Sequence, residues 1–140
     1  MAPLEGLWGA AEESLSRALD AAALRQRVVA HNLANLETPG YRRFQVVFEE
    51  LLAQQQARQS RLRLSLATTH PAHLKGIPAR PVGPVVVRDE GTIYRNDANN
   101  VDPERELATM AKNGLWYRSL SRAMSARFAS LRTAIHEGRR

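Results

Sequence analysis

The sequence predicts a mainly α-helical protein in which a long helix near each end of the chain pairs with the other in a coiled-coil-like layer. Two observations support this fold class. Apolar residues near both ends recur at spacings of three and four, which keeps a narrow apolar stripe on one side of a helix. The stretch between them is rich in Pro and Gly, a composition that opposes regular structure. A short third helix and a small β-hairpin in a partly extended middle complete the single predicted domain.

The two apolar stripes predict that the ends of the chain meet. A stripe of this kind is buried only by another helix, so we expect the two long helices to contact each other and some of these contacts to form between subunits. The predicted stripe residues are Leu15, Leu19, Ala22, Gln26, Val29, Leu33 and Leu36 in the first helix, and Leu107, Met110, Gly114, Tyr117, Ser121, Met124, Phe128, Leu131 and Ile135 in the second.

The N-terminal part of the domain is expected to begin with a disordered segment over residues 1–11, which carries Pro and Gly and no apolar pattern. The first long helix should then run over residues 12–37. It should end there because Thr38 precedes Pro39, which pushes it out of the α region, and because Gly40 can take a positive φ.

Residues 44–56 are predicted to contain the short third helix, because apolar residues recur at i, i+3, i+4, i+7 and i+8. These residues are Phe44, Val47, Phe48, Leu51 and Leu52. Residues 57–100 form the flexible middle. Within it, the alternation over Arg61–Leu66 predicts a strand or an extended segment, and Val85–Val87 followed by Thr92–Tyr94 predicts a β-hairpin.

The second long helix should occupy most of residues 101–140. Asp102 is a strong N-cap, Pro103 suits the first helical position, and the acidic Glu104 and Glu106 complement the helix dipole. The helix should continue to about Glu137, where a glycine follows.

Composition limits the function classes. Twenty Lys and Arg against fourteen Asp and Glu give a net charge of +6. These basic residues are spread over the chain, which favours a solvated surface over a binding patch. With no cysteine, and only His70 and His73 as a possible metal pair, we expect no metal and no cofactor. No catalytic motif is present, so an enzyme is not expected.

The sequence also predicts no cleaved Sec signal, since the N-terminus lacks a basic region followed by an unbroken apolar run. No stretch approaches the roughly 18 apolar residues that span a bilayer. A protein of this kind that leaves the cytoplasm uses another route.

The most specific local string lies at the end of the first helix. Asn32 and Asn35 are neighbours on one flank of that helix, and Thr38-Pro39-Gly40-Tyr41 follow. Their amides can bond loop backbone or an adjacent chain. From these residues alone, an ordinary helix C-terminal turn is the alternative interpretation.

Together with Asn99-Asn100-Val101-Asp102, the following Glu106 and the segment Arg127–Ile135, this string resembles the terminal signatures of flagellar axial proteins, in particular of the short proximal rod subunits. The likeness covers roughly residues 15–52 and 96–138. Ala98 stands where that family often has Gly, and His31 where it often has Asn. The resemblance implies that the following residues serve assembly: Asn32, Asn35, Thr38, Pro39, Gly40, Tyr41, Asn100, Val101 and Asp102.

The resemblance implies a structural subunit of the flagellar basal-body rod in the periplasm, the drive shaft between the membrane ring and the hook, needed for motility. Such subunits polymerise helically through their paired terminal helices and are exported without a cleaved signal peptide. The implied partners are further copies, other rod subunits, the rod-base protein FliE, the membrane (MS) ring and the flagellar type III export apparatus. Charge alone leaves one alternative, a basic helical nucleic-acid-binding or coiled-coil adaptor protein.

Overall fold

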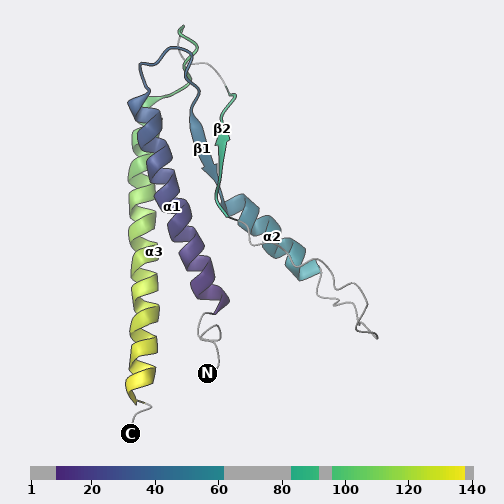
Figure 1. The fold of residues 1–140 in the computed structure, drawn as a ribbon, viewed down its shortest axis with the longest axis vertical. Helices are drawn as coiled ribbons and strands as arrows, with labels where there is room; N and C mark the ends of the chain where they lie inside the picture. Colours follow the sequence, from purple (N-terminus) through teal and green to yellow (C-terminus); the bar gives the residue numbers. More distant parts are fainter. Residues whose placement is uncertain (1–8, 62–82, 92–95, 138–140) are drawn as a thin grey trace, which may run out of the picture.

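The computed structural model describes residues 9–61, 83–91 and 96–137, which form two long helices, one shorter helix and a two-stranded antiparallel sheet (Figure 1). This confirms the predicted fold class. In chain order the elements are α1 (Ala10–Ala34), β1 (Phe44–Val47), α2 (Glu49–Arg61), β2 (Val85–Arg88) and α3 (Pro103–Glu137).

Helices α1 and α3 lie side by side and antiparallel, so that the end of α1 is next to the start of α3 (Figure 1). The apolar core between them is thin. Its buried members are small or few, with Ala21, Ala22 and Val29 on α1 and Leu120 on α3. Burial of so little apolar surface contributes only a few kcal/mol, so other interactions must fix how the helices cross.

The ends of α3 agree with the prediction, because their signals are local. The Asp102 carboxylate accepts hydrogen bonds from the backbone N–H groups of Glu104 at 3.0 Å and Arg105 at 3.3 Å, and the helix continues to Glu137. The ends of α1 differ from the prediction. The helix begins at Ala10, two residues early, and ends at Ala34 rather than residue 37.

The early end of α1 follows from Asn35. Its side-chain amide donates to the carbonyl of His31 at 2.9 Å, and its backbone N–H reaches the same carbonyl at 3.2 Å. The backbone then leaves the helical conformation at this residue, with φ −104° and ψ 19°. Side-chain bonds of this kind compete with the helical pattern and favour a turn.

The helix predicted from Phe44 is wrong over its first four residues, which form strand β1. This strand pairs with β2 in an antiparallel register that places Phe44 opposite Arg88 and Val47 opposite Val85. A helix does follow, but α2 starts at Glu49. The apolar spacing over 44–52 is compatible with either structure, and a pairing partner 38–44 residues away decides between them.

The strand predicted at Val85–Val87 is present as part of β2, and its described partner is β1, which the sequence did not indicate. The other strand of the predicted hairpin, Thr92–Tyr94, lies outside the described residues, as do His70, His73 and residues 62–66 of the predicted alternating strand. Arg61, the first residue of that alternation, is the last residue of α2.

Helix α2 leads away from the helix pair and packs along neither α1 nor α3 (Figure 1). An ion pair holds its first turn to α1, with the Arg25 guanidinium donating to both oxygens of Glu49 at 2.9 and 2.7 Å. The rest of α2 therefore projects as an arm from the body formed by α1, α3 and the small sheet.

Candidate functional site: a buried polar joint between the chain ends

The best-buried large side chains of the described residues are mostly polar, and they gather where α1 ends, β1 begins and α3 starts. They are at most 7% exposed. Apolar packing does not account for such a cluster, because buried polar groups destabilise a fold unless each finds a partner. We call this cluster the polar joint; it comprises Asn32, Arg43, Asn99, Asn100 and Glu106, with Tyr41 and Asp89 at its edge.

Asn32 connects three parts of the chain. Its amide nitrogen donates to the Phe44 carbonyl at 2.8 Å and to the Glu106 carboxylate at 3.0 Å. Its oxygen accepts from the Phe44 N–H and from the Tyr41 hydroxyl, both at 3.0 Å. All four of its hydrogen-bonding positions are used, so α1, the first residue of β1 and α3 are tied together by one side chain.

Arg43 balances the two carboxylates of the joint. One guanidinium nitrogen lies 3.1 Å from a Glu106 oxygen, and the other donates to Asp89 at 3.0 Å. Asn100 reinforces the same link, since it accepts from the Arg43 N–H at 2.7 Å and donates to the Asp89 carbonyl at 2.9 Å. Because a buried carboxylate needs a nearby cation, Arg43 and Glu106 depend on each other.

Asn99 closes the C-terminal end of α1. Its amide nitrogen lies 3.1, 3.0 and 3.0 Å from the carbonyl oxygens of Asn35, Leu36 and Thr38, and its oxygen accepts from the Val101 N–H at 2.7 Å. The last carbonyls of a helix have no partner within it, and the Asn35 carbonyl at the C-cap is one of them. Asn99, from the segment before α3, supplies a partner to this carbonyl and to two carbonyls of the following turn.

The turn between α1 and β1 uses two residues with positive φ on facing segments. Gly40 has a φ of +70°, as expected from the sequence, and its N–H donates to the Asp97 carbonyl at 2.8 Å. On the facing segment Ala98, which follows Asp97, has a φ of +64°. Alanine rarely adopts this conformation, which costs roughly 1–2 kcal/mol.

Tyr41 turns its hydroxyl into the joint. The hydroxyl lies 2.8 Å from His31 Nδ1 and donates to Asn32, and the ring meets Phe44 edge-on with centroids 6.1 Å apart. Burial, followed by the nearby Glu106 carboxylate, raises the pKa of Tyr41 above its ordinary value. The phenol is therefore held in its neutral, hydrogen-bonding form.

The structure brings most of the predicted motif residues together in or beside this joint. Asn32, Asn100 and Val101 are buried, Tyr41 is half-buried, and Asp102 caps α3. Asn35, Thr38, Pro39 and Gly40 form the surrounding turn. Their predicted role in assembly stays a prediction.

Four residues of the joint and its edge were absent from the predicted site, namely Arg43, Asp89, Asn99 and Glu106. Asn99 and Glu106 both belong to the segment that carries the family resemblance, so their positions were a usable signal. Arg43 and Asp89 had none, because a charged residue outside an apolar pattern looks like a surface residue until its partner is known.

The buried line of α3 is displaced by one residue from the predicted stripe. Glu106, Asn113 and Leu120 are buried, whereas the predicted Leu107, Gly114 and Ser121 each follow one of them and are less buried. Met110, Met124 and Leu131 are half-buried. Six large apolar side chains of α3 remain 44–65% exposed, namely Leu107, Leu115, Trp116, Tyr117, Phe128 and Ile135.

On α1, the predicted stripe does face α3 at its middle. Ala22 and Val29 are buried, and the four leucines of the stripe are half-buried. Gln26 is exposed but accepts a 2.9 Å hydrogen bond from Asn113, whose amide also donates to the Ala22 carbonyl at 2.9 Å. The four leucines are Leu15, Leu19, Leu33 and Leu36.

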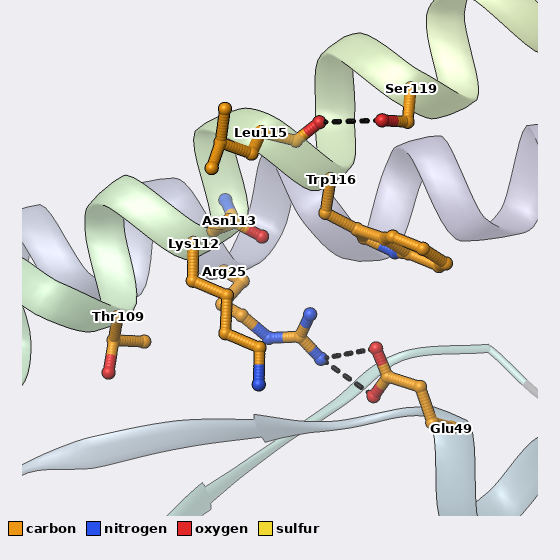
Figure 2. Close-up of a pocket in the computed structure, with 8 residues that line it drawn as sticks. All are labelled: Arg25, Glu49, Thr109, Lys112, Asn113, Leu115, Trp116 and Ser119. Atoms are coloured by element: carbon orange, nitrogen blue, oxygen red, sulfur yellow. Dashed lines mark hydrogen bonds and ion pairs between the residues drawn. The ribbon is translucent and has the colours of Figure 1, made fainter.

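A groove of about 640 Å³ lies between α3 and the start of α2. Figure 2 shows the Arg25–Glu49 ion pair inside it, with Lys112 and Trp116 extending from α3 on either side of the guanidinium. Its walls are a salt bridge and an amphipathic helix face, with no nucleophile placed beside a base among these lining residues.

None of the helices within residues 9–61, 83–91 and 96–137 has the length and apolar character needed to cross a membrane. The same part of the chain holds no group of three or more His, Cys, Asp or Glu side chains able to hold a metal ion.

Comparison with known proteins gives consistent matches. Residues 13–42 match the family described as "Flagella basal body rod protein". The flagellar basal body rod protein FlgB of Bacillus subtilis (strain 168) is 31% identical over 127 residues, covering 91% of this chain and 94% of that protein. FlgB of Escherichia coli (strain K12) is 31% identical over 86% of this chain and 89% of its own length. The rod protein FlgG of Buchnera aphidicola subsp. Acyrthosiphon pisum (strain APS) is 35% identical over 82 residues, which cover 58% of this chain and 31% of FlgG.

Proposed function

Because the chain belongs to the FlgB family of flagellar basal body rod proteins, which is a structural family and not one of enzymes, we propose that it polymerises helically with copies of itself and with other rod subunits. The assembly it helps to build is the rod that transmits rotation from the membrane ring to the hook. The polar joint holds the paired terminal helices in one arrangement, and the pair is the unit that repeats.

The observation that carries this proposal is the exposed apolar surface of α3. Six large apolar side chains on this helix are 44–65% exposed in the single chain. Tyr117, Phe128 and Ile135 share one side of α3 by helical spacing, and apolar side chains gathered on one exposed face support a protein–protein interface there. Contacts between two different faces of identical copies form a ring if the rotation between copies closes and an open helical assembly if it does not, and the proposal is the second case.

The further parts of the proposal come from the family likeness. The partners are other rod subunits, the rod-base protein FliE, the membrane (MS) ring and the type III export apparatus, which passes the chain without a cleaved signal peptide. A matched relative named as the rod protein FlgG supports a common rod assembly. The nucleic-acid-binding and adaptor alternatives receive no support from these relatives, which are all named as rod proteins.

Deletion of the gene tests the proposal. We expect basal bodies from the deletion strain to retain the membrane ring and to lack a rod, as seen by electron microscopy of purified particles. A plasmid copy should restore the rod, and a tagged copy should purify with it. Complete rods in the deletion strain contradict the proposal.

A further inference from the structure

We propose that Asn113, which Gly114 follows, is a site of spontaneous deamidation that reacts in the unfolded chain and is shielded once α1 and α3 pair. This inference goes beyond the proposed function, because it concerns the chemistry of the chain itself and holds whatever assembly the chain enters. Asn113 is the only asparagine in the sequence that a glycine follows. The modification needs no enzyme and no co-reactant other than water.

The reaction joins the asparagine side chain to the backbone of the next residue. The Gly114 backbone nitrogen loses its proton and attacks Asn113 Cγ, so that a new N–C bond forms. The Cγ–Nδ2 bond then breaks and ammonia leaves, which gives a cyclic imide. Water opens the imide at either of its carbonyls and yields aspartate or isoaspartate. Glycine favours the first step, because it has no Cβ to crowd the attacking nitrogen and adopts the required backbone conformations at little cost.

The backbone of α3 opposes the first step. Asn113 and Gly114 lie in the interior of this 35-residue helix. In an α-helix each backbone N–H points along the axis to the carbonyl four residues earlier, which for Gly114 is the carbonyl of Met110. The nitrogen therefore faces away from Asn113 Cγ and its proton is held in a hydrogen bond. Ring closure requires the helix to open locally, at a cost in free energy.

The side chain of Asn113 is held as well. It lies on the side of α3 that faces α1 and is 4% exposed (Figure 2). Its Nδ2 donates to the Ala22 carbonyl and to Gln26 Oε1, both at 2.9 Å. These two bonds fix the amide that has to rotate toward the backbone, and burial keeps out the water that opens the imide. Pairing with α1 therefore adds to the protection that the helix itself gives.

The products do not fit the place that Asn113 occupies. Aspartate has the same size but lacks both N–H groups, and it sets a carboxylate beside two acceptor oxygens, those of Ala22 and Gln26. Asn113 Oδ1 already has no hydrogen-bond partner among the described residues, so aspartate adds a second buried oxygen in need of a donor. Isoaspartate lengthens the backbone by a methylene group and breaks the helical repeat of α3. A chain that deamidates before it folds therefore closes the helix pair poorly.

Deamidation rates in the folded and the unfolded chain test the shielding. The purified full-length chain is kept at one mildly alkaline pH, in native buffer and in concentrated guanidinium chloride, and mass spectrometry of its peptides follows each asparagine. We expect Asn113 to convert at least about tenfold faster in denaturant, since in native buffer the packed helix must first open. Asn35, which a leucine follows, is the internal control and should convert far more slowly than Asn113 in denaturant. Equal rates for Asn113 in the two buffers, or equal rates for Asn113 and Asn35 in denaturant, overturn the inference.

Gly114→Ala separates the chemistry from the fold. A Cβ at this position meets no atom within 4 Å, and alanine favours a helix more than glycine does. The melting temperature of the variant should therefore equal or exceed that of the wild type. In denaturant the added Cβ crowds the attacking nitrogen, so conversion of Asn113 should slow by about tenfold. An unchanged rate in denaturant contradicts the role given to the glycine.

Asn113→Asp carries the product from the start. Its melting temperature should fall by about 4 °C or more, because two buried hydrogen bonds are lost. Asn96→Asp makes the same chemical change at an exposed residue and should leave the melting temperature nearly unchanged. An equal fall in both variants, or a fall in neither, overturns the statement that the product fits the helix pair poorly. None of these results depends on the rod, so the proposed function stands or falls separately.

Discussion

The two ends of the α1–α3 pair are built on opposite principles. Where α1 ends and α3 begins, the contacts are directional hydrogen bonds and ion pairs among buried polar side chains such as Asn32, Asn99 and Glu106. Toward the other end, α3 is largely exposed and carries apolar side chains such as Phe128 and Ile135 at its surface. The first end is bonded within a single chain, apart from Arg43 Nε and Glu106 Oε1, which have no hydrogen-bond partner among the described residues, and the second end leaves apolar side chains exposed.

This difference separates two tasks. Directional bonds permit few alternative arrangements, so the joint sets the position of α3 relative to α1 and of the sheet relative to both. Apolar contacts are less directional and tolerate the adjustments that a curved assembly demands. Changes at the joint should therefore act on the fold of the single chain, and changes at the exposed end on assembly.

The largest effect on the fold is expected from Glu106→Ala. It leaves the buried Arg43 with only Asp89 as an ion-pair partner and removes an acceptor of Asn32. Breaking a buried pair in this way costs about 3–5 kcal/mol of unfolding free energy. Urea denaturation followed by circular dichroism measures it. The control is Glu104→Ala, two residues away on the same helix and exposed, which should cost about 1 kcal/mol or less. Equal losses in both variants contradict a stabilising joint.

A smaller loss is expected from Gly40→Val. The φ of +70° is unfavourable for a β-branched residue and should cost on the order of 1–3 kcal/mol. A Cβ at this position meets nothing within 4 Å, so the loss reports backbone strain alone. Thermal unfolding of the variant, with Gly40→Asn as the control that tolerates positive φ, checks the prediction. Equal destabilisation by Val and Asn argues against strain as the cause.

Phe128→Asp should impair assembly far more than it destabilises the single chain. The side chain is already 44% exposed, so the single chain should lose only about 1 kcal/mol. In the rod, however, a carboxylate buried without a partner costs several kcal/mol, so the variant should be exported and yet fail to join the rod. Basal-body purification and export assays measure the two steps. The exposed Arg122→Asp is the control and should be milder; if both variants assemble equally well, the Phe128 surface is not an interface.

The smallest expected effect is a gain in the free energy of unfolding. Ala98→Gly removes the cost of a positive φ at alanine and should raise the unfolding free energy by about 0.5–1 kcal/mol, after the greater unfolded-state entropy of glycine is subtracted. Ala108→Gly, in the interior of α3, should lower it by about 1 kcal/mol. Opposite signs for the same chemical change support the conformation of the turn; a loss at both positions contradicts it.

The parts of the fold that the sequence predicted well depend on local signals. Asp102 and Pro103 mark the start of α3, and Gly40 takes the positive φ expected after Pro39. The parts predicted wrongly depend on distant partners. Strand β1 exists because β2 pairs with it, and the turn after α1 is completed by Asn99, which binds three of its carbonyl oxygens.

Only part of the polar joint was predicted from the sequence. The motif asparagines drew attention because their spacing put them on one helix flank, and the resemblance placed Asn100 and Val101 with them. Glu106 was expected only to complement the helix dipole and to belong to the family resemblance, and Arg43 was not singled out, since hydrophobic periodicity treats a charged residue as a surface residue. The same limitation explains why the buried line of α3, which includes Glu106 and Asn113, runs one residue away from the apolar stripe.

The polar joint also sets the order in which the chain can fold. Its central bond joins Asn32 and Glu106, 74 positions apart, and the Asn113–Ala22 bond spans 91. Contacts of such long range form slowly, because the entropy of closing the loop is lost before the contact stabilises anything. Whichever long helix forms first, the joint closes only when the other motif is present. A chain truncated before Glu106 therefore lacks the joint, and we expect such incomplete copies to be excluded from the proposed assembly.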